Sequence, residues 1–211
     1  MFRVTLNRHV SHVIVGFMDT KLHLDKAKTA LVVIDLQKGI AAMPTQPHAA
    51  VAVIRRAASL AATFRQHNMP VFLVRVTSAP DGKDLLNPMV DVSWPARQMA
   101  SDWSDIVPEI GPDPGDLIIT KKQWGAFYDT GLDLQLRRRG MTTIVLCGIA
   151  TNFGVESTAR FAYEYGYHQI FAEDAMSAMA KEDHEFAVNK ILPRLGLVRS
   201  THDILDALLR T

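Results

Sequence analysis

The sequence predicts an α/β fold, with a single domain built as a three-layer α/β/α sandwich around a mainly parallel six-stranded Rossmann-like sheet. Three observations predict it. Six apolar runs rich in β-branched residues are too short for helices, and helix-period segments lie between most of them. No tight hairpin signal joins neighbouring runs, which favours parallel strands.

The first strand is expected at residues 29–35 (TALVVID), because this run is apolar on both faces. In residues 51–64, apolar side chains then recur at helical spacing and predict a helix with one stripe against the sheet. Residues 70–76 (PVFLVRV) follow as the second strand. The later strands are expected at residues 116–120, 142–147, 168–172 and 197–199.

Residues that commonly begin or end helices support the helices between the later strands. Gly140 ends the segment LDLQLRRR, whose leucine spacing fits either a helix or a strand; its place between two strands favours the helix. Pro193 ends a helix that begins near Lys181. Ser200 and Asp203 have the spacing of a capping box for the last helix.

Residues 79–114 differ from the rest of the chain, because they hold six prolines and two tryptophans and are too long for a simple connector. Such a segment forms a lid, a pocket wall or a subunit contact. No internal repeat or linker divides the chain. Residues 1–17 precede a second methionine, Met18, and are expected to be an accessory arm or an upstream start; residues 18–211 form the domain.

Composition excludes several classes of protein. With 211 residues, 48% of them hydrophobic, the chain can bury a core of its own, and its net charge of +1 gives no reason to expect a nucleic-acid or membrane partner. No run approaches the roughly 20 apolar residues that span a bilayer. Because Cys147 is the only cysteine and no secretory signal is recognisable, we expect a cytoplasmic protein.

The first functional candidates lie at strand ends, because ligands of a doubly wound parallel sheet bind beyond the carboxyl ends of its strands. Asp35 closes the first strand after five apolar residues. Lys121 directly follows the third strand, and its long side chain could reach back over the sheet edge toward Asp35. The alternatives are a cap of the following turn for Asp35 and a solvated side chain for Lys121.

A third candidate segment, residues 148–160 (GIATNFGVESTAR), leads from a strand through a tight turn into a helix. Thr151 or Asn152 fits the helix cap, and the free backbone N–H groups of the first turn suit an anion or a developing oxyanion. The layout resembles a nucleophile elbow, yet the turn contains no serine or cysteine. Cys147, inside the strand, is expected to be a small buried hydrophobe.

Missing motifs narrow the chemistry further. The first strand is not followed by GxGxxG, no Walker-type lysine loop occurs, and none of the eight histidines has an HExxH-like or paired-ligand spacing. Nucleotide-binding and metal-hydrolase functions are therefore disfavoured, and we expect no metal and no cofactor.

Taken together, the three candidate segments resemble the isochorismatase-like hydrolase superfamily, also called the cysteine hydrolases. VVIDLQ resembles the first-strand motif of that family, TKKQWGAFYDTGLDLQLRRRG its lysine segment, and GIATNFGVESTAR with FAEDAM its turn and following strand. The resemblance runs from about residue 29 to the carboxyl terminus and is weakest across residues 79–114. The fold that it implies agrees with the strands expected above.

The resemblance implies positions for catalytic residues. In the amidase branch, which includes nicotinamidases, an Asp, a Lys and a Cys form a triad; Asp35 matches the acid, and Lys121 matches the lysine better than Lys122. Gly154 holds the position of the cysteine, and Ser157, nearly a full helical turn later, should point elsewhere. The zinc ligands of nicotinamidases have no counterpart after Asp35.

Isochorismatases proper also carry glycine at that position, because splitting a vinyl ether needs protonation of a carbon and attack by water. By this resemblance Asp35 would be the general acid, Lys121 would position the substrate and stabilise charge, and Gly154 would leave room for substrate. Burial would have to outweigh Lys121 to keep Asp35 protonated. Ile34 and Val76 depart from the histidine and glutamine that isochorismatases typically carry at these positions.

We take seven residues as candidates for substrate binding, although a place in the core is the commoner role of Trp124 and Phe127. The seven are Gln37, Trp124, Phe127, Ile149, Ala150, Thr151 and Asn152. In isochorismatases the turn reads more like Tyr-Ala-His than the Ile149, Ala150, Thr151 and Asn152 found here. The resemblance also implies a non-proline cis peptide bond between Ile149 and Ala150.

The first functional hypothesis is a cofactor-free hydrolase of a small anionic or carbonyl-bearing molecule, with hydrolysis of isochorismate to dihydroxy-dihydrobenzoate and pyruvate as its specific reaction. The alternative is a non-catalytic binding protein that has lost the nucleophile. Amidase activity ranks last, because Gly154 removes the attacking atom. A homo-oligomer, dimer or higher, is expected by resemblance and because residues 79–114 could complete a neighbour's pocket.

Overall fold

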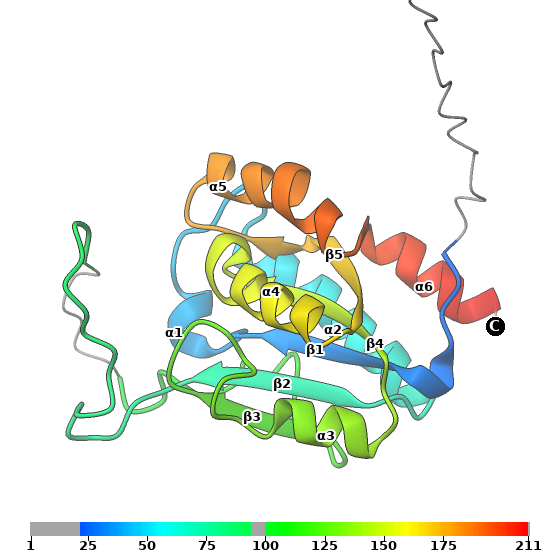
Figure 1. Cartoon of the computed structure of the whole chain (residues 1–211), viewed down its shortest axis with the longest axis horizontal. Helices are drawn as coiled ribbons and strands as arrows, with labels where there is room; N and C mark the ends of the chain where they lie inside the picture. Colours follow the sequence, from blue (N-terminus) through cyan, green and yellow to red (C-terminus); the bar gives the residue numbers. More distant parts are fainter. Residues whose placement is uncertain (1–21, 94–99, 211) are drawn as a thin grey trace, which may run out of the picture.

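A computed structural model describes residues 22–93 and 100–210 and confirms the expected α/β fold, with one six-stranded parallel sheet between two layers of helices (Figure 1). The proposed accessory arm, residues 1–17, lies outside the described residues. The strands are β1 Thr29–Ile34, β2 Val71–Val76, β3 Leu117–Lys121, β4 Thr143–Ile149, β5 His168–Ser177 and β6 Leu197–Arg199. The helices are α1 Lys38–Ala41, α2 Ala50–Gln66, α3 Leu132–Arg138, α4 Glu156–Glu164, α5 Lys181–Phe186 and α6 Thr201–Arg210.

The strands lie in the order β3-β2-β1-β4-β5-β6, and every neighbouring pair is parallel. The chain builds outward from β1 to β3, crosses back to place β4 beside β1, and then builds in the other direction. Val32 of β1 therefore lies between Phe72 of β2 and Leu146 of β4. The direction of winding reverses between β1 and β4, and the carboxyl ends of these two strands form the topological switch point at which such folds bind ligands.

Helices cover both faces of the sheet: α2 and α6 lie on one face and α3 and α4 on the other (Figure 1). Every residue of β1 is buried, as a strand with helices on both faces requires. The helix α2 turns one apolar stripe to the sheet, as its spacing predicts. The buried residues of that stripe are Val53, Ala57, Leu60, Ala61 and Phe64.

Two neighbouring strands run further than the sequence predicts. The strand β4 was expected to end at residue 147 but continues to Ile149. The strand β5 was expected at residues 168–172 but continues to Ser177, because after a register shift Gly148 pairs with Met176 and Ile149 with Ser177. Glu173 and Asp174 interrupt the apolar pattern and conceal this extension. The added length carries β4 and β5 up to the switch point.

Two of the three predicted helix ends are confirmed. The third is wrong: α5 begins at Lys181 as expected but ends at Phe186, and Pro193 lies within the helical turn Leu192–Arg194 that follows. Gly140 follows α3 with a positive φ of 67°, and the N–H of Met141 donates to the carbonyl of Leu136 (2.9 Å), so the leucine-rich segment is a helix. At the start of α6, the N–H of Asp203 donates to Ser200 Oγ (3.1 Å) and the N–H of Ser200 donates to Asp203 Oδ2 (3.2 Å). This reciprocal pair is the expected capping box, with an aspartate in the place of the usual glutamate.

Residues 79–93, here called the arm, hold no helix or strand and extend away from the body of the molecule (Figure 1). Residues 100–114 return to the body, where Val107 and Ile110 are buried and the N–H of Gly39 donates to the carbonyl of Trp103 (2.9 Å). Within the described ranges, no helix combines the length and the apolar character needed to cross a membrane.

Candidate active site

Asp35 and Lys121 meet at the switch point, as the sequence predicts. Asp35 follows β1 with a φ of 51°, and Lys121 is the last residue of β3, two strands away. Lys121 Nζ donates to Asp35 Oδ2 (2.8 Å) and to the carbonyls of Gln123 (3.0 Å) and Trp124 (2.7 Å). All three ammonium donors are thus engaged, and the ion pair is buried.

The environment of Asp35 favours its protonated form. Burial raises the pKa of this carboxyl to about 6, although the charge of Lys121 and its hydrogen bond act in the opposite direction. Because Oδ2 accepts from Lys121 and Oδ1 has no hydrogen-bond partner among the described residues, Oδ1 is the oxygen suited to carry the proton. Near neutral pH, Asp35 is therefore an acid that can both hold and release a proton.

A cavity of about 530 Å³ contains this pair and is otherwise mostly apolar. Its polar side chains are Asp35, Lys121, Lys122 and Gln123, and Lys122 already pairs with Asp84 (2.7 Å). The apolar side chains of the wall are Ile40, Met43, Val76, Leu85, Leu86, Trp103, Trp124, Ile149, Ala150, Phe153 and Met179. Of the substrate-binding candidates, Trp124, Ile149 and Ala150 therefore line the cavity.

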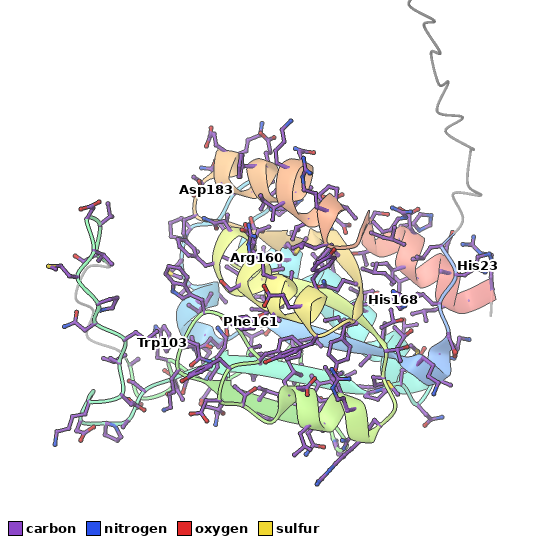
Figure 2. The ribbon with its side chains drawn as sticks, viewed as in Figure 1. His23, Trp103, Arg160, Phe161, His168 and Asp183 are labelled. Carbon is purple, nitrogen blue, oxygen red and sulfur yellow. The ribbon has the colours of Figure 1, made fainter. Side chains whose placement is uncertain are left out.

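The segment 79–114 supplies part of this wall through Leu85, Leu86 and Trp103. Figure 2 shows Trp103 at the end of the body from which the arm extends. Sequence reasoning noted Trp103 as part of this segment but listed none of the three as a site residue, because they lie on irregular segments without periodicity. The only signal was the length and composition of the excursion, which pointed to a pocket wall as one of its roles.

The turn after β4 brings Gly154 beside Asp35. The peptide bond between Ile149 and Ala150 is cis, as expected, and the π-helical segment Thr151–Val155 leads from there into α4. A Cβ atom added to Gly154 would lie 3.0 Å from Asp35 Oδ2 and 2.8 Å from Ile34 Cγ2. Position 154 thus adjoins the acid, and a side chain there would crowd Ile34.

Gln37 and Phe127 do not line the cavity, contrary to expectation. The Gln37 side chain is buried and bonds to the backbone of Val76, accepting from its N–H (2.8 Å) and donating to its carbonyl (3.0 Å). Phe127 is buried against the rings of Tyr165 and Tyr167. The partners of both side chains lie in the body of the protein. These contacts fix the loops around the cavity, and the side chains do not face a ligand in it.

Thr151 and Asn152 also lie outside the wall of the cavity. Thr151 is fully buried, and its hydroxyl forms a hydrogen bond with Nδ1 of His184 (2.9 Å), so it points into the body rather than toward a ligand. Asn152 Oδ1 is buried without a hydrogen-bond partner among the described residues. Neither side chain caps the following helix.

Among the described residues, no hydroxyl or thiol nucleophile faces Asp35 in the cavity. Cys147 is buried inside β4, and burial raises the pKa of its thiol to about 12, so the reactive thiolate does not form near neutral pH. None of the described residues that line the cavity is a serine, threonine or cysteine. The arrangement offers a proton donor without a protein nucleophile.

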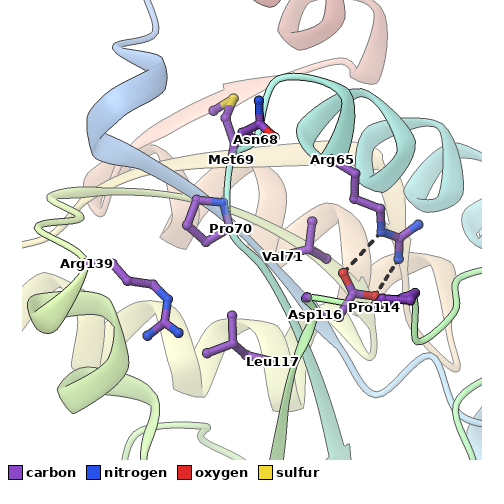
Figure 3. Close-up of a pocket in the computed structure, with 10 residues that line it drawn as sticks. Arg65, Asn68, Met69, Pro70, Val71, Pro114, Asp116, Leu117 and Arg139 are labelled. Carbon is purple, nitrogen blue, oxygen red and sulfur yellow. Dashed lines mark hydrogen bonds and ion pairs between the residues drawn. The ribbon is translucent and has the colours of Figure 1, made fainter.

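A second hollow, of about 290 Å³, lies at the amino ends of β2 and β3 (Figure 3). Arg65 at its edge is held by Asp116 through two hydrogen bonds (3.1 and 2.7 Å), so its charge is already paired. Because ligands of this fold bind at the carboxyl ends of the strands, we assign the candidate site to the cavity with Asp35.

Comparison with known proteins points to one family. Residues 29–203 match the family model described as the isochorismatase domain. The uncharacterised isochorismatase family protein YecD of Escherichia coli O157:H7 is 51% identical over 187 residues, which cover 89% of this chain and 100% of YecD. YwoC of Bacillus subtilis strain 168, also uncharacterised, is 50% identical over 193 residues, which cover 90% of this chain and 98% of YwoC.

Solved structures agree with these relatives. An isochorismatase family protein of Burkholderia thailandensis superposes with a TM-score of 0.85 at 44% identity, covering 89% of this chain and 98% of that one. N-carbamoylsarcosine amidase of Thermoplasma acidophilum superposes with a TM-score of 0.67 at 28% identity, covering 82% of this chain and 96% of that one. From its matched domain and its relatives over nearly their full length, the chain belongs to the isochorismatase family of hydrolases.

Proposed function

We propose that this protein hydrolyses a small molecule by acid catalysis from Asp35, with water rather than a cysteine as the nucleophile. Hydrolysis of a vinyl ether, as in the isochorismatase reaction, is the chemistry that the site supports best. The observation that carries this proposal is a buried carboxyl at the cavity with a pKa of about 6, whose Oδ1 has no hydrogen-bond partner among the described residues and whose Oδ2 lies beside Gly154.

The reaction begins when Asp35 Oδ1 gives its proton to the terminal carbon of the vinyl ether, whose double-bond electrons form the new C–H bond. Lys121 Nζ, already bonded to Oδ2, stabilises the carboxylate that is left. Water adds to the resulting oxocarbenium carbon and returns a proton to Asp35. The hemiketal then breaks its C–O bond, its hydroxyl proton passes to the leaving oxygen, and an alcohol and a carbonyl compound are released.

Gly154 contributes space rather than a reacting atom. Since a Cβ atom there would lie within 3.0 Å of Asp35 Oδ2 and of Ile34 Cγ2, glycine keeps open the approach of a substrate carbon to the acid. The same two close contacts oppose a cysteine at position 154 unless the side chain of Ile34 moves. The name of the Thermoplasma neighbour suggests amide hydrolysis. By an acyl-enzyme route that reaction would lack a cysteine nucleophile here.

The cavity wall favours a substrate with an apolar body. Lys121 and Lys122 are engaged with Asp35 and Asp84, so the described part of the wall offers no unpaired cation to a carboxylate. We therefore propose vinyl ethers as the reaction class and isochorismate, which carries two carboxylates, as the reference substrate rather than the preferred one.

The test is release of pyruvate from isochorismate, run beside neutral enol ethers and a panel of small amides. We expect turnover of at least one vinyl ether and a loss of about 10²-fold or more in Asp35→Asn. Asp102→Asn, which changes an exposed carboxylate paired with Lys38, is the matched control and should keep full activity.

Turnover that survives Asp35→Asn, or hydrolysis of amides in place of vinyl ethers, would contradict the proposal. Binding of members of the panel without turnover would instead favour a non-catalytic binding protein that keeps the cavity.

A further inference from the structure

Two histidines and a glutamate from three separate segments meet beside Thr151 of the β4–α4 turn. His48 lies in the loop before α2, Glu173 in β5 and His184 in α5. One ligand-capable atom from each lies within 4.8 Å of the other two. The two imidazole rings are 5.8 Å apart between centroids and nearly perpendicular, at 86°.

Two of the three side chains have polar atoms without a partner. Among the described residues, no hydrogen bond or ion pair engages the carboxylate of Glu173 or the ring nitrogens of His48. The neighbouring Arg56 pairs with Asp174 instead (3.3 Å). Burial lowers the pKa of both His48 and His184. The positive charge of Arg56 acts on Glu173 and on His48 from a distance, without a hydrogen bond or ion pair to either.

The third side chain is oriented by a neighbour. Thr151 Oγ1 and His184 Nδ1 are 2.9 Å apart, which leaves Nε2 of His184 as the free nitrogen. Histidines that bind metals commonly use one nitrogen in this way to fix the ring. His184 is 3% exposed, so its hydrogen bond with Thr151 is buried.

The loop that carries His48 is held to the end of β5. Ser177 Oγ donates to the carbonyl of His48 (2.8 Å), and Gln46 and Ala178 form an antiparallel bridge with hydrogen bonds of 2.8 and 3.0 Å. In Figure 1 this loop, in blue, runs up toward α5. The backbone around the cluster is therefore fixed before any ligand arrives.

We propose that His48, Glu173 and His184 bind a divalent transition-metal ion, for which Zn²⁺ is the best match. Two imidazoles and a carboxylate are a common zinc ligand set, and water would complete a tetrahedron. Zinc bonds of about 2.0–2.2 Å set ligand atoms about 3.4 Å apart, so the side chains close by about an ångström on binding. None of the three lines the cavity with Asp35, so the ion would be separate from the candidate active site.

Such an ion connects the loop before α2, β5 and α5, and through Thr151 it supports the turn that carries Ile149 and Ala150 into the cavity wall. Spacing in the sequence does not reveal this site, because His48 is far from the other two residues along the chain. The expectation of no metal rested on motifs of closely spaced ligands and on the missing counterparts of the nicotinamidase zinc ligands after Asp35, and neither concerns these three residues.

The experiment measures Zn²⁺ binding to the full chain, freed of purification tags and stripped by a chelator, by calorimetry and by metal analysis after dialysis. We expect one Zn²⁺ per chain, a higher Tm with Zn²⁺, and no such shift with Mg²⁺, which prefers oxygen ligands. His48→Ala and Glu173→Gln should each weaken binding at least tenfold, and Thr151→Val about 10- to 100-fold.

His168→Ala, at an exposed histidine at the start of β5, is the matched control and should bind Zn²⁺ like the unchanged chain. The pair His9→Ala and His12→Ala removes the two histidines of the amino-terminal segment that could bind zinc on their own. Absence of stoichiometric binding, or binding that survives His48→Ala and Glu173→Gln, would overturn the proposal. His184→Ala is unsuitable as the sole variant, because it also removes the bond to Thr151.

Discussion

At the scale of single residues, two opposing effects determine the pKa of Asp35. Burial disfavours its carboxylate, and Lys121 at 2.8 Å favours it, with burial the larger of the two. A pKa of about 6 follows, which is a value suited to proton transfer near neutral pH. The sequence could not decide this balance, because it depends on how much of the carboxyl the cavity and the sheet cover.

The pH dependence of hydrolysis tests the role of Asp35 as an acid. If the protonated form is required, kcat/KM should be level below pH about 6 and fall about tenfold for each unit above it. A pH profile of kcat/KM for the best substrate measures this. A rate that instead rises through pH 6 would mean that the carboxylate acts as a base.

Replacing Lys121 tests the ion pair through stability. With its pKa raised, Asp35 favours folding below its unfolded pKa of 3.8, and this contribution is lost as the pH rises through about 6. Lys121→Met raises the pKa further, so it should destabilise more at pH 8 than at pH 5, by about 1.4 kcal/mol for each unit of added shift. Urea denaturation at the two pH values measures the difference.

Lys122→Met is the control for that experiment, because its partner Asp84 has a pKa below 3.8 and does not titrate between pH 5 and 8. Its effect on the free energy of unfolding should be the same at both pH values. An equally constant effect for Lys121→Met would contradict a protonated Asp35.

At the scale of elements, Gly148 allows β4 to approach β1 closely, so that the turn after β4 lies at the site. It has a φ of 120°, and a Cβ atom there would lie 2.0 Å from the carbonyl oxygen of Ile34, in the neighbouring strand. Gly148→Ala should therefore cost roughly 2–6 kcal/mol, from backbone strain together with overpacking. Denaturant unfolding measures this loss.

Gly131→Ala is the comparison for Gly148→Ala, because nothing lies within 4 Å of the added Cβ. It should change the free energy of unfolding by less than about 1 kcal/mol. Similar losses in the two variants would mean that the close approach of β4 to β1 does not limit this position.

The sequence predicts elements best where one physical signal dominates. The strand β1 is buried on both faces and α2 on one stripe, so hydrophobic periodicity alone locates them. The end of β5 escapes prediction because Glu173 and Asp174 interrupt the pattern, while pairing with β4 maintains the strand. Register across strands is a tertiary effect that a local pattern does not contain.

The site was predictable in part, for a related reason. Asp35 and Lys121 end parallel strands, so topology alone brings them to one edge. Whether Gln37 and Phe127 point into a cavity or into the body depends on the partner that each side chain finds. Val76, the partner of Gln37, lies 39 residues along the chain, and Tyr165, a partner of Phe127, lies 38 residues along it. The wall from Leu85, Leu86 and Trp103 likewise follows from how an irregular segment packs.

At the scale of the whole molecule, the arm presents apolar side chains to solvent. Met89 and Val92 are 103% and 87% exposed, and Leu85, Leu86 and Val90 are more than half exposed. An apolar segment that stands away from the body in this way is typical of a protein–protein contact. The expected homo-oligomer stays a prediction, and the arm is where its contact would form.

We predict that the arm holds two copies of the chain together. Burying a large apolar side chain contributes about 1.5–3 kcal/mol, so Met89→Glu with Val92→Glu should weaken the dimer about 100-fold or more. Light scattering coupled to gel filtration measures the mass across the micromolar range, and Leu209→Glu, at a residue 75% exposed on α6, is the matched control.

Because Leu85 and Leu86 join the cavity wall to the arm, dissociation should also lower the activity of the double variant in proportion to the monomer formed. A monomeric unchanged chain at micromolar concentration would contradict the prediction, and a double variant that stays dimeric would place the contact on another surface.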